Sequence, residues 1–479
     1  MEQGETSAQA EIPEEPEDNR KKIDIVFHLF FDGTLNNRTN IDQRLIATDE
    51  STDEWDALDD LEREAAADLK KNLSPEQIEE AKAVYKKYGK KKNSYEDAYS
   101  NIVKLEKYVK VDRTSAEKLV LAAYIEGIGT LDKESDKSLG AAFGVFKAGI
   151  KAKVEAGLRQ LVKKIEDNHW QKETVITTLT INLFGFSRGA TAARHFIHAA
   201  QLTNPGGGGT IAEQLDALDY QVSQVNIGFA GLFDTVASHG VSFSNDTAAL
   251  NLTAIKHAAD VVHLTSADEH RKKFSLTNID SSSGGREIFL PGVHADIGGS
   301  YRNGLDEDQW VFWRKNIFSA GKQAEAEKAR LVAANWYKAE ELTLIRIDLD
   351  TVIISAKRSN ISNRYSQIPL HIMARLARET DCTESSIVFE DKLEDSEEII
   401  AELEAANTAI QTYVDQHKAK GARSSQPEDW HDNQRGWLRD LRYGYFHFSA
   451  KSAPPSMSAL FPHAPNYENG KRQRKTRPG

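Results

Sequence analysis

The chain has 479 residues, a formal net charge of −12 and a single cysteine, Cys382. One cysteine excludes an internal disulfide framework and a four-cysteine zinc module, and the acidic balance argues against a dedicated nucleic-acid binder. The length allows one large α/β domain with insertions, or two to three smaller domains. No stretch approaches the roughly 20 apolar residues that a membrane-spanning helix needs.

The first 20 residues are rich in Glu, Pro and Ala and contain seven acidic side chains. This composition predicts a disordered tail, and it is the reverse of a secretory signal peptide. We therefore expect synthesis in the cytoplasm, with any export following a route that needs no signal peptide.

An apolar, β-branched run over residues 23–31 stops at Asp32-Gly33, which predicts a buried strand followed by a tight turn. Charged residues dominate from 49 to 92, and this stretch is predicted to be a charged helical insertion. Three apolar residues are expected to anchor the insertion along one face: Trp55, Leu58 and Leu61.

Strands and helices then alternate, which implies a mostly parallel sheet with helices on both faces. The predicted strands are 119–125, 175–184, 225–233 and 287–290, and the predicted helices are 139–165, 188–201 and 255–267. Helix 139–165 carries several lysines, so it either packs on the sheet or lies on an anionic membrane surface. Beyond residue 305 the chain is expected to be mainly helical, and 342–347 fits either an edge strand or the start of a helix.

The segment Gly185-Phe186-Ser187-Arg188-Gly189 lies between a predicted strand and a predicted helix, the context of a nucleophile elbow. A serine in such a turn is strained, and larger side chains in place of Gly185 and Gly189 would collide there. The N-terminus of the following helix directs its free N–H groups toward a developing oxyanion. The alternative is an ordinary glycine turn between a strand and a helix.

A serine nucleophile needs a base and an acid that orients the base. Asp234 ends the strand 225–233, where the sheet topology would place an acid beside the elbow. The alternative role for Asp234 is to cap the next turn or helix.

The candidate base is His294, which follows a short strand in the glycine-rich segment 291–299. A purely structural histidine is the alternative interpretation. The competing histidines are His239, His263, His371 and His447. His263 is expected inside a helix and His371 near a helix start, so His447 is the main rival.

The loop after the first strand is expected to supply the second part of an oxyanion hole. Gly33 would let the backbone approach the substrate, and Asp32 and Thr34 would fix the loop through side-chain hydrogen bonds. Backbone N–H groups at Arg188, Gly33 and Thr34 are the predicted donors. The same segment is similar to the Asp-x-Asp-Gly-Thr motif of haloacid-dehalogenase-type phosphatases, but Phe30 stands in place of the nucleophilic aspartate and removes that chemistry.

Five segments together resemble the bacterial type VI secretion phospholipase effectors of the Gly-x-Ser-x-Gly class: 31–34, 124–130, 185–190, 233–236 and 291–299. The resemblance implies an α/β-hydrolase fold with Ser187 as nucleophile, Asp234 as acid and His294 as base. Asp32, Gly185, Gly189 and Asp296 would belong to the supporting loops.

The resemblance also implies antibacterial phospholipase A activity in the periplasm of a target cell, loading on a secretion spike protein and neutralisation by a cognate immunity protein. The chemistry requires no metal or organic cofactor. A soluble carboxylesterase of the same fold and a non-catalytic adaptor remain the alternative functions.

The expected organisation has four parts. They are a disordered acidic tail over 1–20, an α/β-hydrolase core over 21–310 that includes the insertion, a helical part over 311–465 that completes or caps the core, and a basic tail over 466–479.

Overall fold

The structure, a computed structural model, describes residues 20–479 apart from short gaps. The gaps are 57, 59, 90–93, 113–114, 116, 137–148, 169–173, 202–210, 240–243, 246, 422–424, 432–434, 454–462 and 469. The disorder predicted for residues 1–19 lies outside the described residues. Among the described helices, none has the length and apolarity needed to cross a membrane.

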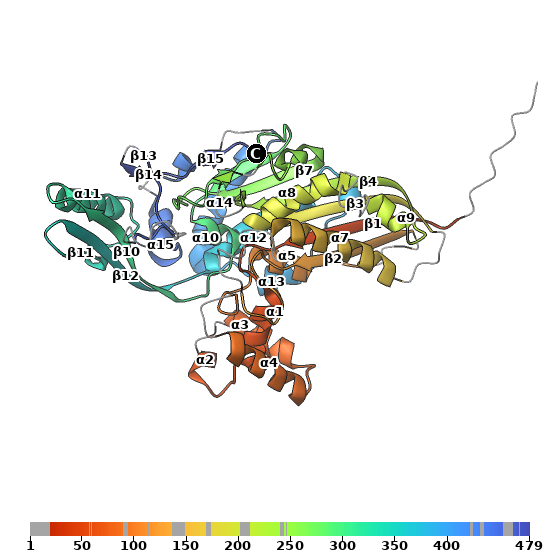
Figure 1. Cartoon of the computed structure of the whole chain (residues 1–479), viewed down its shortest axis with the longest axis horizontal. Coiled ribbons are helices and arrows are strands. Elements are labelled where there is room, and N and C mark those ends of the chain that lie inside the picture. Colours follow the sequence, from red (N-terminus) through yellow and green to blue (C-terminus); the bar gives the residue numbers. More distant parts are fainter. Residues whose placement is uncertain are drawn as a thin grey trace, which may run out of the picture.

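A parallel sheet of six strands, in the order β2-β1-β3-β4-β7-β9, forms the centre of the molecule (Figure 1). The strands are β1 (Lys22–Phe31), β2 (Lys118–Ile125), β3 (Val175–Phe186), β4 (Gln221–Phe233), β7 (Ala258–Ser266) and β9 (Arg286–Leu290). Both faces of such a sheet are covered, which explains the nearly continuous apolar runs in its strands. The predicted α/β fold is confirmed.

The strand order reverses at β1 and β3, because β2 lies outside β1 while β4, β7 and β9 continue beyond β3. In open parallel sheets, ligands bind outside the carboxyl ends of the strands at this reversal. The turns that follow β1 and β3 therefore lie where a binding site is expected.

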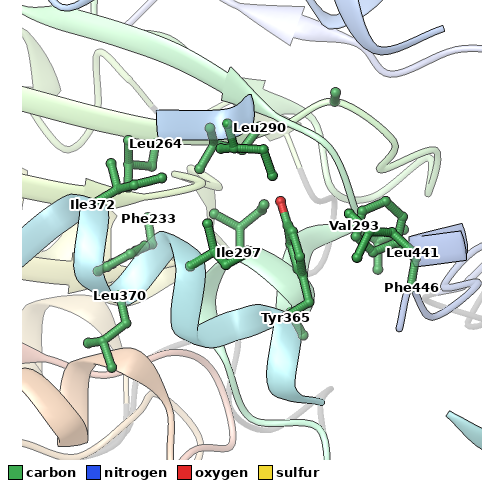
Figure 2. Packing of buried hydrophobic residues seen from close by; sticks show 14 of the residues in the cluster. Phe233, Leu264, Leu290, Val293, Ile297, Tyr365, Leu370, Ile372, Leu441 and Phe446 are labelled. Carbon is green, nitrogen blue, oxygen red and sulfur yellow. The ribbon is translucent and has the colours of Figure 1, made fainter. Parts of the chain in front are cut away.

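Helices α7 (Ile150–Asp167) and α8 (Arg188–Gln201) cover one face of the sheet, and α5 (Asn101–Tyr108) and α12 (Gln367–Arg378) cover the other. On the α12 face, Ile372 packs in one buried cluster with Phe233 and Leu264 of the strands (Figure 2). Each such side chain contributes roughly 1.5–3 kcal/mol through burial.

The basic helix that was predicted over 139–165 packs on the sheet where it is described. Its apolar positions, which recur with helical spacing, are buried against the strands: Ile150, Val154, Leu158, Leu161 and Ile165. Lys153 is buried too and pairs with Glu126 at 2.7 Å. Residues 139–148 of the predicted helix lie outside the described residues.

The prediction of a helix over 255–267 is wrong. A short 3-10 turn (Leu252–His257) leads into strand β7, which lies between β4 and β9. A short apolar run bordered by polar residues fits a buried strand or a buried helix equally well, and pairing with distant strands decides between them.

The expectation of a mainly helical segment beyond residue 305 also needs correction. Residues 305–361 form an antiparallel sheet of β10 (Leu305–Lys315), β12 (Thr351–Ile361) and β11 (Leu342–Arg346), with β11 at its edge. Helix α11 (Ala320–Ala333) packs on β10 and β12. Helices dominate only after β12, with α12, α13 (Lys392–Ser396), α14 (Glu404–His417) and α15 (Gly436–Gly444).

The charged stretch 49–92 contains helices α2 (Asp53–Asp56), α3 (Asp60–Lys70) and α4 (Pro75–Tyr88), which extend α1 (Arg38–Ala47) below the sheet (Figure 1). They share a small core of Ile41, Leu45, Leu58 and Ala66, with Trp55 packed against it. Leu61 is half-buried. A buried ion pair of 2.6 Å between Arg44 and Glu62 ties α3 to α1.

The basic tail predicted over 466–479 is in fact packed against the molecule. Strand β15 (Thr476–Arg477) pairs in parallel with β8 (Leu276–Thr277), and the amide of Leu276 donates to the carbonyl of Lys475 at 2.8 Å. A run of basic residues ordinarily indicates a solvated segment, but buried carboxylates elsewhere in this fold bind its arginines.

Candidate active site

Ser187 occupies the turn between β3 and α8 in a left-handed backbone conformation, with φ of 59°. A Cβ added to Gly185 would lie 2.6 Å from the Cα of Ala190. A Cβ added to Gly189 would lie 2.3 Å from backbone oxygens at the end of β1. Only glycine fits at both positions, so the turn has the geometry of a nucleophile elbow.

Ser187, His294 and Asp234 form a continuous chain of hydrogen bonds. The Oγ of Ser187 lies 2.8 Å from Nε2 of His294, and Nδ1 of His294 lies 2.5 Å from Oδ2 of Asp234. The three residues follow β3, β9 and β4, and His294 begins the short helix α10 (His294–Gly298). The structure thus brings together the three residues that the sequence predicted, at the carboxyl ends of the strands.

Asp234 is fully buried and has more partners than the sequence indicated. Its Oδ1 accepts from the amide of Ser266 at 2.9 Å, and the guanidinium of Arg474 contacts both carboxylate oxygens, at 2.5 and 2.9 Å. Burial alone would raise the pKa of Asp234, but Arg474 and His294 outweigh it and hold that pKa far below its usual range. The carboxylate is therefore ionised at neutral pH.

Sequence reasoning missed Arg474, because it lies 240 positions from Asp234 in a segment predicted to be a basic tail. No local pattern distinguishes it from the neighbouring basic residues. The only available signal was the concentration of positive charge in an otherwise acidic chain.

The imidazole of His294 is buried between two aromatic rings, with centroids 4.7 Å from Phe186 and 5.1 Å from Phe274. Burial lowers the pKa of His294, and the carboxylate of Asp234 opposes that shift only in part. The imidazole is therefore neutral at pH 7, the state that can accept a proton.

A second buried ion pair, also missed, supports the loop beside His294. Glu269 accepts from Arg271 at 2.9 and 2.8 Å and from Ser449 at 3.1 and 3.0 Å. Burial alone would raise the pKa of Glu269, but Arg271 outweighs it and lowers that pKa to about 2. The guanidinium carbon of Arg271 also lies 3.3 Å from the centroid of the Phe274 ring, which holds this ring against His294.

The rival His447 is engaged elsewhere. Its Nδ1 lies 2.8 Å from Asp296, and its ring stacks on Tyr301 at 3.8 Å. Asp296 also accepts from the amide of Val293 at 2.9 Å and so caps the helix that begins with His294. The predicted supporting role of Asp296 has a structural basis in this cap.

Of the other candidate histidines, His263 has partners of its own. His263 is in β7, where its Nδ1 lies 2.9 Å from Glu287 and its Nε2 accepts from the amide of Thr235 at 3.0 Å. His371 is on α12, and His239 is in the short strand β5 (Ser238–His239).

In the loop after β1, the carboxylate of Asp32 accepts three hydrogen bonds of 2.7 Å each, from the amide of Gly33 and the hydroxyls of Ser100 and Tyr124. Burial raises the pKa of Asp32 to about 6 despite these bonds. Because the N–H of Gly33 is committed to Asp32, the prediction that Gly33 donates to an oxyanion needs correction. Gly33 is required for space instead, since a Cβ would lie 2.5 Å from the ring of Phe186.

A cavity of about 280 Å³ opens beside Ser187. Its apolar lining includes Leu35, Phe186, Val236 and Phe274. Its basic side chains are Arg188, Arg271 and Lys273. Asp97 also lines the cavity, and burial raises its pKa to about 8, so its carboxyl group is largely protonated at pH 7. The cavity therefore combines apolar walls with basic side chains, of which Arg271 is paired with Glu269.

Thr34 belongs to the same lining, and its hydroxyl accepts from Nε of Arg188 at 2.5 Å. This bond joins the loop after β1 to the start of α8, so the two predicted sources of oxyanion donors lie together.

Within the described ranges, no group of three or more His, Cys, Asp or Glu side chains is arranged to hold a metal ion.

The parallel sheet and the serine turn at its carboxyl edge define an α/β-hydrolase-like protein. The family model of the type VI secretion system "Phospholipase effector Tle1-like, catalytic domain" matches residues 86–206 and 209–313. This part of the chain is therefore similar to that catalytic domain. The match confirms the predicted resemblance and the predicted class of function, a phospholipase effector of the type VI secretion system.

Among solved structures, a Tle1 effector bound to the VgrG spike of the type 6 secretion system is similar to this chain, with a TM-score of 0.61 and 20% identity over 99% of both chains. This likeness supports the same fold. An uncharacterised protein from Pseudomonas aeruginosa is 17% identical, with a TM-score of 0.40, over 86% of this chain and 52% of its own. No curated protein matches the sequence.

Proposed function

We propose that the protein is a serine-dependent phospholipase that hydrolyses fatty-acyl esters of membrane phospholipids. The observation that carries this proposal is the hydrogen-bond chain from Ser187 through His294 to Asp234 at the wall of a cavity. The carboxylate of Asp234 keeps the proton of the imidazole on Nδ1, which leaves Nε2 to accept the proton of Ser187.

In the proposed reaction, Oγ of Ser187 attacks the ester carbonyl carbon while His294 takes the hydroxyl proton. The tetrahedral intermediate collapses when His294 returns this proton to the departing lysophospholipid alkoxide. Water then gives a proton to His294 and attacks the acyl-enzyme. His294 passes this proton to the departing Oγ of Ser187, which releases the fatty acid and restores the free enzyme.

Two backbone N–H groups are proposed to stabilise the oxyanion. One belongs to Arg188, the first residue of α8, where the helix dipole adds partial positive charge. The second belongs to Thr34 rather than Gly33, because Gly33 donates to Asp32 whereas Thr34 lines the cavity.

The cavity lining favours a phospholipid over an uncharged small ester. Its apolar side chains suit an acyl chain, and the guanidinium and ammonium groups of Arg188, Arg271 and Lys273 suit an anionic headgroup phosphate.

We further propose that the chain is synthesised in the cytoplasm, delivered by the type VI apparatus and active in the periplasm of a target cell. The family match supports this delivery route. Because the similar Tle1 effector is bound to a VgrG spike, we propose a spike protein as a partner here too. A cognate immunity protein that blocks the activity is part of the same proposal.

Release of fatty acid from vesicles of phosphatidylethanolamine and phosphatidylglycerol tests the proposal. We expect Ser187→Ala to reduce the rate by at least about 10³-fold with an unchanged melting temperature, and a fluorophosphonate probe to label only chains that retain Ser187. The exposed Ser135→Ala is the matched control.

Three results would contradict the proposal. Full activity of Ser187→Ala would exclude Ser187 as the nucleophile. Hydrolysis of short soluble esters without any release from vesicles would indicate a carboxylesterase. Absence of both labelling and turnover would indicate a non-catalytic adaptor.

A further inference from the structure

Arg474 binds the buried carboxylate of Asp234 from a distant part of the chain. Besides its two contacts with Asp234, its Nε donates to the carbonyl of Phe274 at 2.9 Å and its Nη1 donates to the carbonyl of Ser266 at 3.3 Å. Its side chain is 7% exposed. One guanidinium thus joins the acid, the end of β7 and the loop whose phenyl ring packs on His294.

The backbone that carries Arg474 is held independently of Asp234. Parallel pairing of β15 with β8 anchors the chain just after it, and the amide of Asn278 donates to the carbonyl of Arg477 at 3.0 Å. Just before it, Arg472 pairs with Glu327 of α11 at 2.8 Å. Two anchored points therefore bring Arg474 to the acid.

Electrostatics explains why such a residue is needed. A carboxylate without a positive partner in a buried site tends to take up a proton, because desolvation penalises its charged form. The neighbouring cation Arg271 is paired with Glu269, so Arg474 is the guanidinium in direct contact with Asp234. Its two parallel N–H groups fix the orientation of the carboxylate as well as its charge.

We propose that Arg474 is a positioning residue that keeps Asp234 ionised and oriented toward His294, so that residues 471–479 complete the active site. This inference rests on the proposed function. Arg474 lies outside the residues that the family model matches, so the inference concerns a feature of this chain beyond that domain.

Arg474→Met, Arg474→Lys and the control Arg477→Met test this role on a soluble short-chain ester. Arg477 is an exposed residue of the same segment. We expect Arg474→Met to lower kcat about tenfold to a hundredfold with little change in KM, because His294 and Asp234 lose their alignment. The acid limb of kcat/KM should move to higher pH, since loss of a nearby positive charge favours protonation of the His294–Asp234 pair.

Arg474→Lys keeps the charge but loses the two-pronged contact, so kcat should fall while the acid limb stays in place. An unchanged kcat in this variant would overturn the inference even if Arg474→Met fails to fold. The activity of Arg474→Met could instead fall only in proportion to the fraction of folded protein, with no shift in the acid limb of kcat/KM. That result would show that Arg474 has a structural role. Ser187→Ala measured in parallel separates the two proposals, because its full activity would contradict the proposed function itself.

A separate observation concerns the far end of the antiparallel sheet. Of the seven large hydrophobic side chains that are exposed among the described residues, five lie there. Four are on two loops, Ile317, Phe318, Ile347 and Leu349, and the fifth, Ile345, is near the end of β11. Phe318 is 90% exposed and Leu349 81% exposed. The amide of Asn316 donates to the carbonyl of Asp350 at 2.7 Å, which joins the loops into one surface, here called the apolar tip.

The charges around the apolar tip differ from those of the whole chain. Four basic residues flank it, Arg314, Lys315, Lys322 and Arg346, against two acidic ones, Asp348 and Asp350. The tip is thus locally positive in a chain with a net charge of −12. It also extends beyond the carboxyl ends of the parallel strands, the side on which the proposed site lies (Figure 1).

We infer that the apolar tip inserts into the interface of an anionic lipid bilayer and so brings the cavity to its substrate. Protruding aliphatic and aromatic side chains flanked by Lys and Arg bind such interfaces through burial and attraction to anionic lipids. The local charge compensates for the repulsion between the acidic chain and the membrane.

Flotation with vesicles of phosphatidylethanolamine and phosphatidylglycerol tests the tip, in a Ser187→Ala background that prevents turnover. Phe318→Ser/Leu349→Ser should weaken binding at least about tenfold. Val111→Ser/Val388→Ser, at the two exposed positions elsewhere, should bind like the parent. With Ser187 restored, hydrolysis of a soluble ester should be unchanged in both pairs. Equal vesicle binding by all variants would overturn the inference. Normal vesicle binding by Phe318→Ser/Leu349→Ser together with a loss of binding to a spike protein would also overturn it, because the tip would then be a protein-docking surface.

Discussion

The turn at Ser187 depends on the absence of side-chain atoms at the neighbouring glycines. Ser187 has a left-handed φ, and the helix that follows it, α8, approaches the end of β1 closely. This approach depends on the missing side chain of Gly189. The glycine spacing could be used to predict this turn from the sequence, because the steric requirement acts between neighbouring residues.

We expect Gly189→Ala to lower the free energy of unfolding by roughly 1–3 kcal/mol, because its methyl group would overlap backbone oxygens. Activity on a soluble ester should fall further, since the elbow must move to relieve the overlap. Gly436→Ala is the control, because a Cβ there meets nothing within 4 Å. Urea denaturation of both variants measures the difference, and equal stabilities would contradict the steric account.

The titration of His294 should appear in the pH dependence of catalysis. Burial lowers its pKa, so kcat/KM should rise with pH through a midpoint below the ordinary histidine value of about 6.5. His447→Gln should leave this midpoint in place, because His447 contacts Asp296 rather than the hydrogen-bond chain. A midpoint well above 6.5, or one that moves with His447, would show that the base is misassigned.

At the scale of elements, local sequence and tertiary pairing disagree in two places. Residues 258–266 are apolar enough for a helix, yet they form the strand between β4 and β9. The segment 305–361 was expected to be mainly helical, but β10, β12 and β11 pair there as an antiparallel sheet. Strand pairing joins residues far apart in sequence, so a single-sequence pattern contains little information about it.

A buried ion pair holds the antiparallel sheet to the C-terminal helices. Arg358 contacts Glu307 at 2.8 Å and donates to carbonyls of Arg442 and Phe446, whereas the neighbouring Lys357 pairs with Asp308 in solvent. We expect Arg358→Met to cost about 3–5 kcal/mol, because it leaves a buried carboxylate uncompensated.

The exposed pair provides a matched control for this substitution. Lys357→Met should change the free energy of unfolding by less than about 1 kcal/mol, because solvent screens that interaction. Chemical denaturation of the two variants compares them directly. Similar losses for both would indicate that burial of the pair does not control its contribution.

At the scale of the whole molecule, two groups of carboxyls with opposite pKa shifts should give stability a maximum in acidic solution. Asp234 and Glu269 have lowered pKa values, so their contribution is present above about pH 4 and is lost as the pH falls through their folded-state values. Asp32 and Asp97 have pKa values raised to about 6 and about 8. Their contribution is fully present below about pH 4 and is lost as the pH rises through those values.

We therefore expect the free energy of unfolding to be greatest near about pH 4 and to decline toward pH 8 and toward pH 2. Urea denaturation across this range measures the profile. Asp97→Asn should remove most of the decline above pH 6.5 while leaving the acid side in place. A steady rise of stability to pH 8 in the parent would contradict the assignment of the raised pKa values.

Much of the site was predictable because its chemistry follows short-range rules. The strand, glycines and helix around Ser187 are contiguous, and Asp234 and His294 both follow strands, so parallel topology brings them to one edge. The oxyanion donor at Gly33 was wrongly predicted, because the side chain of Asp32 binds that amide. Such competition depends on where a carboxylate points after folding.

By itself, the sequence determined the α/β class, the elbow and the order of the three site residues, because strand periodicity and glycine sterics act within a few positions. Only the tertiary structure decided that residues 471–479 pack beside the acid, that Arg474 compensates Asp234, and that the apolar tip is exposed. The physical reason is that burial, charge pairing and exposure depend on surfaces assembled from distant segments, and a basic residue has the same local sequence signature in a solvated tail as in an ion pair within the protein.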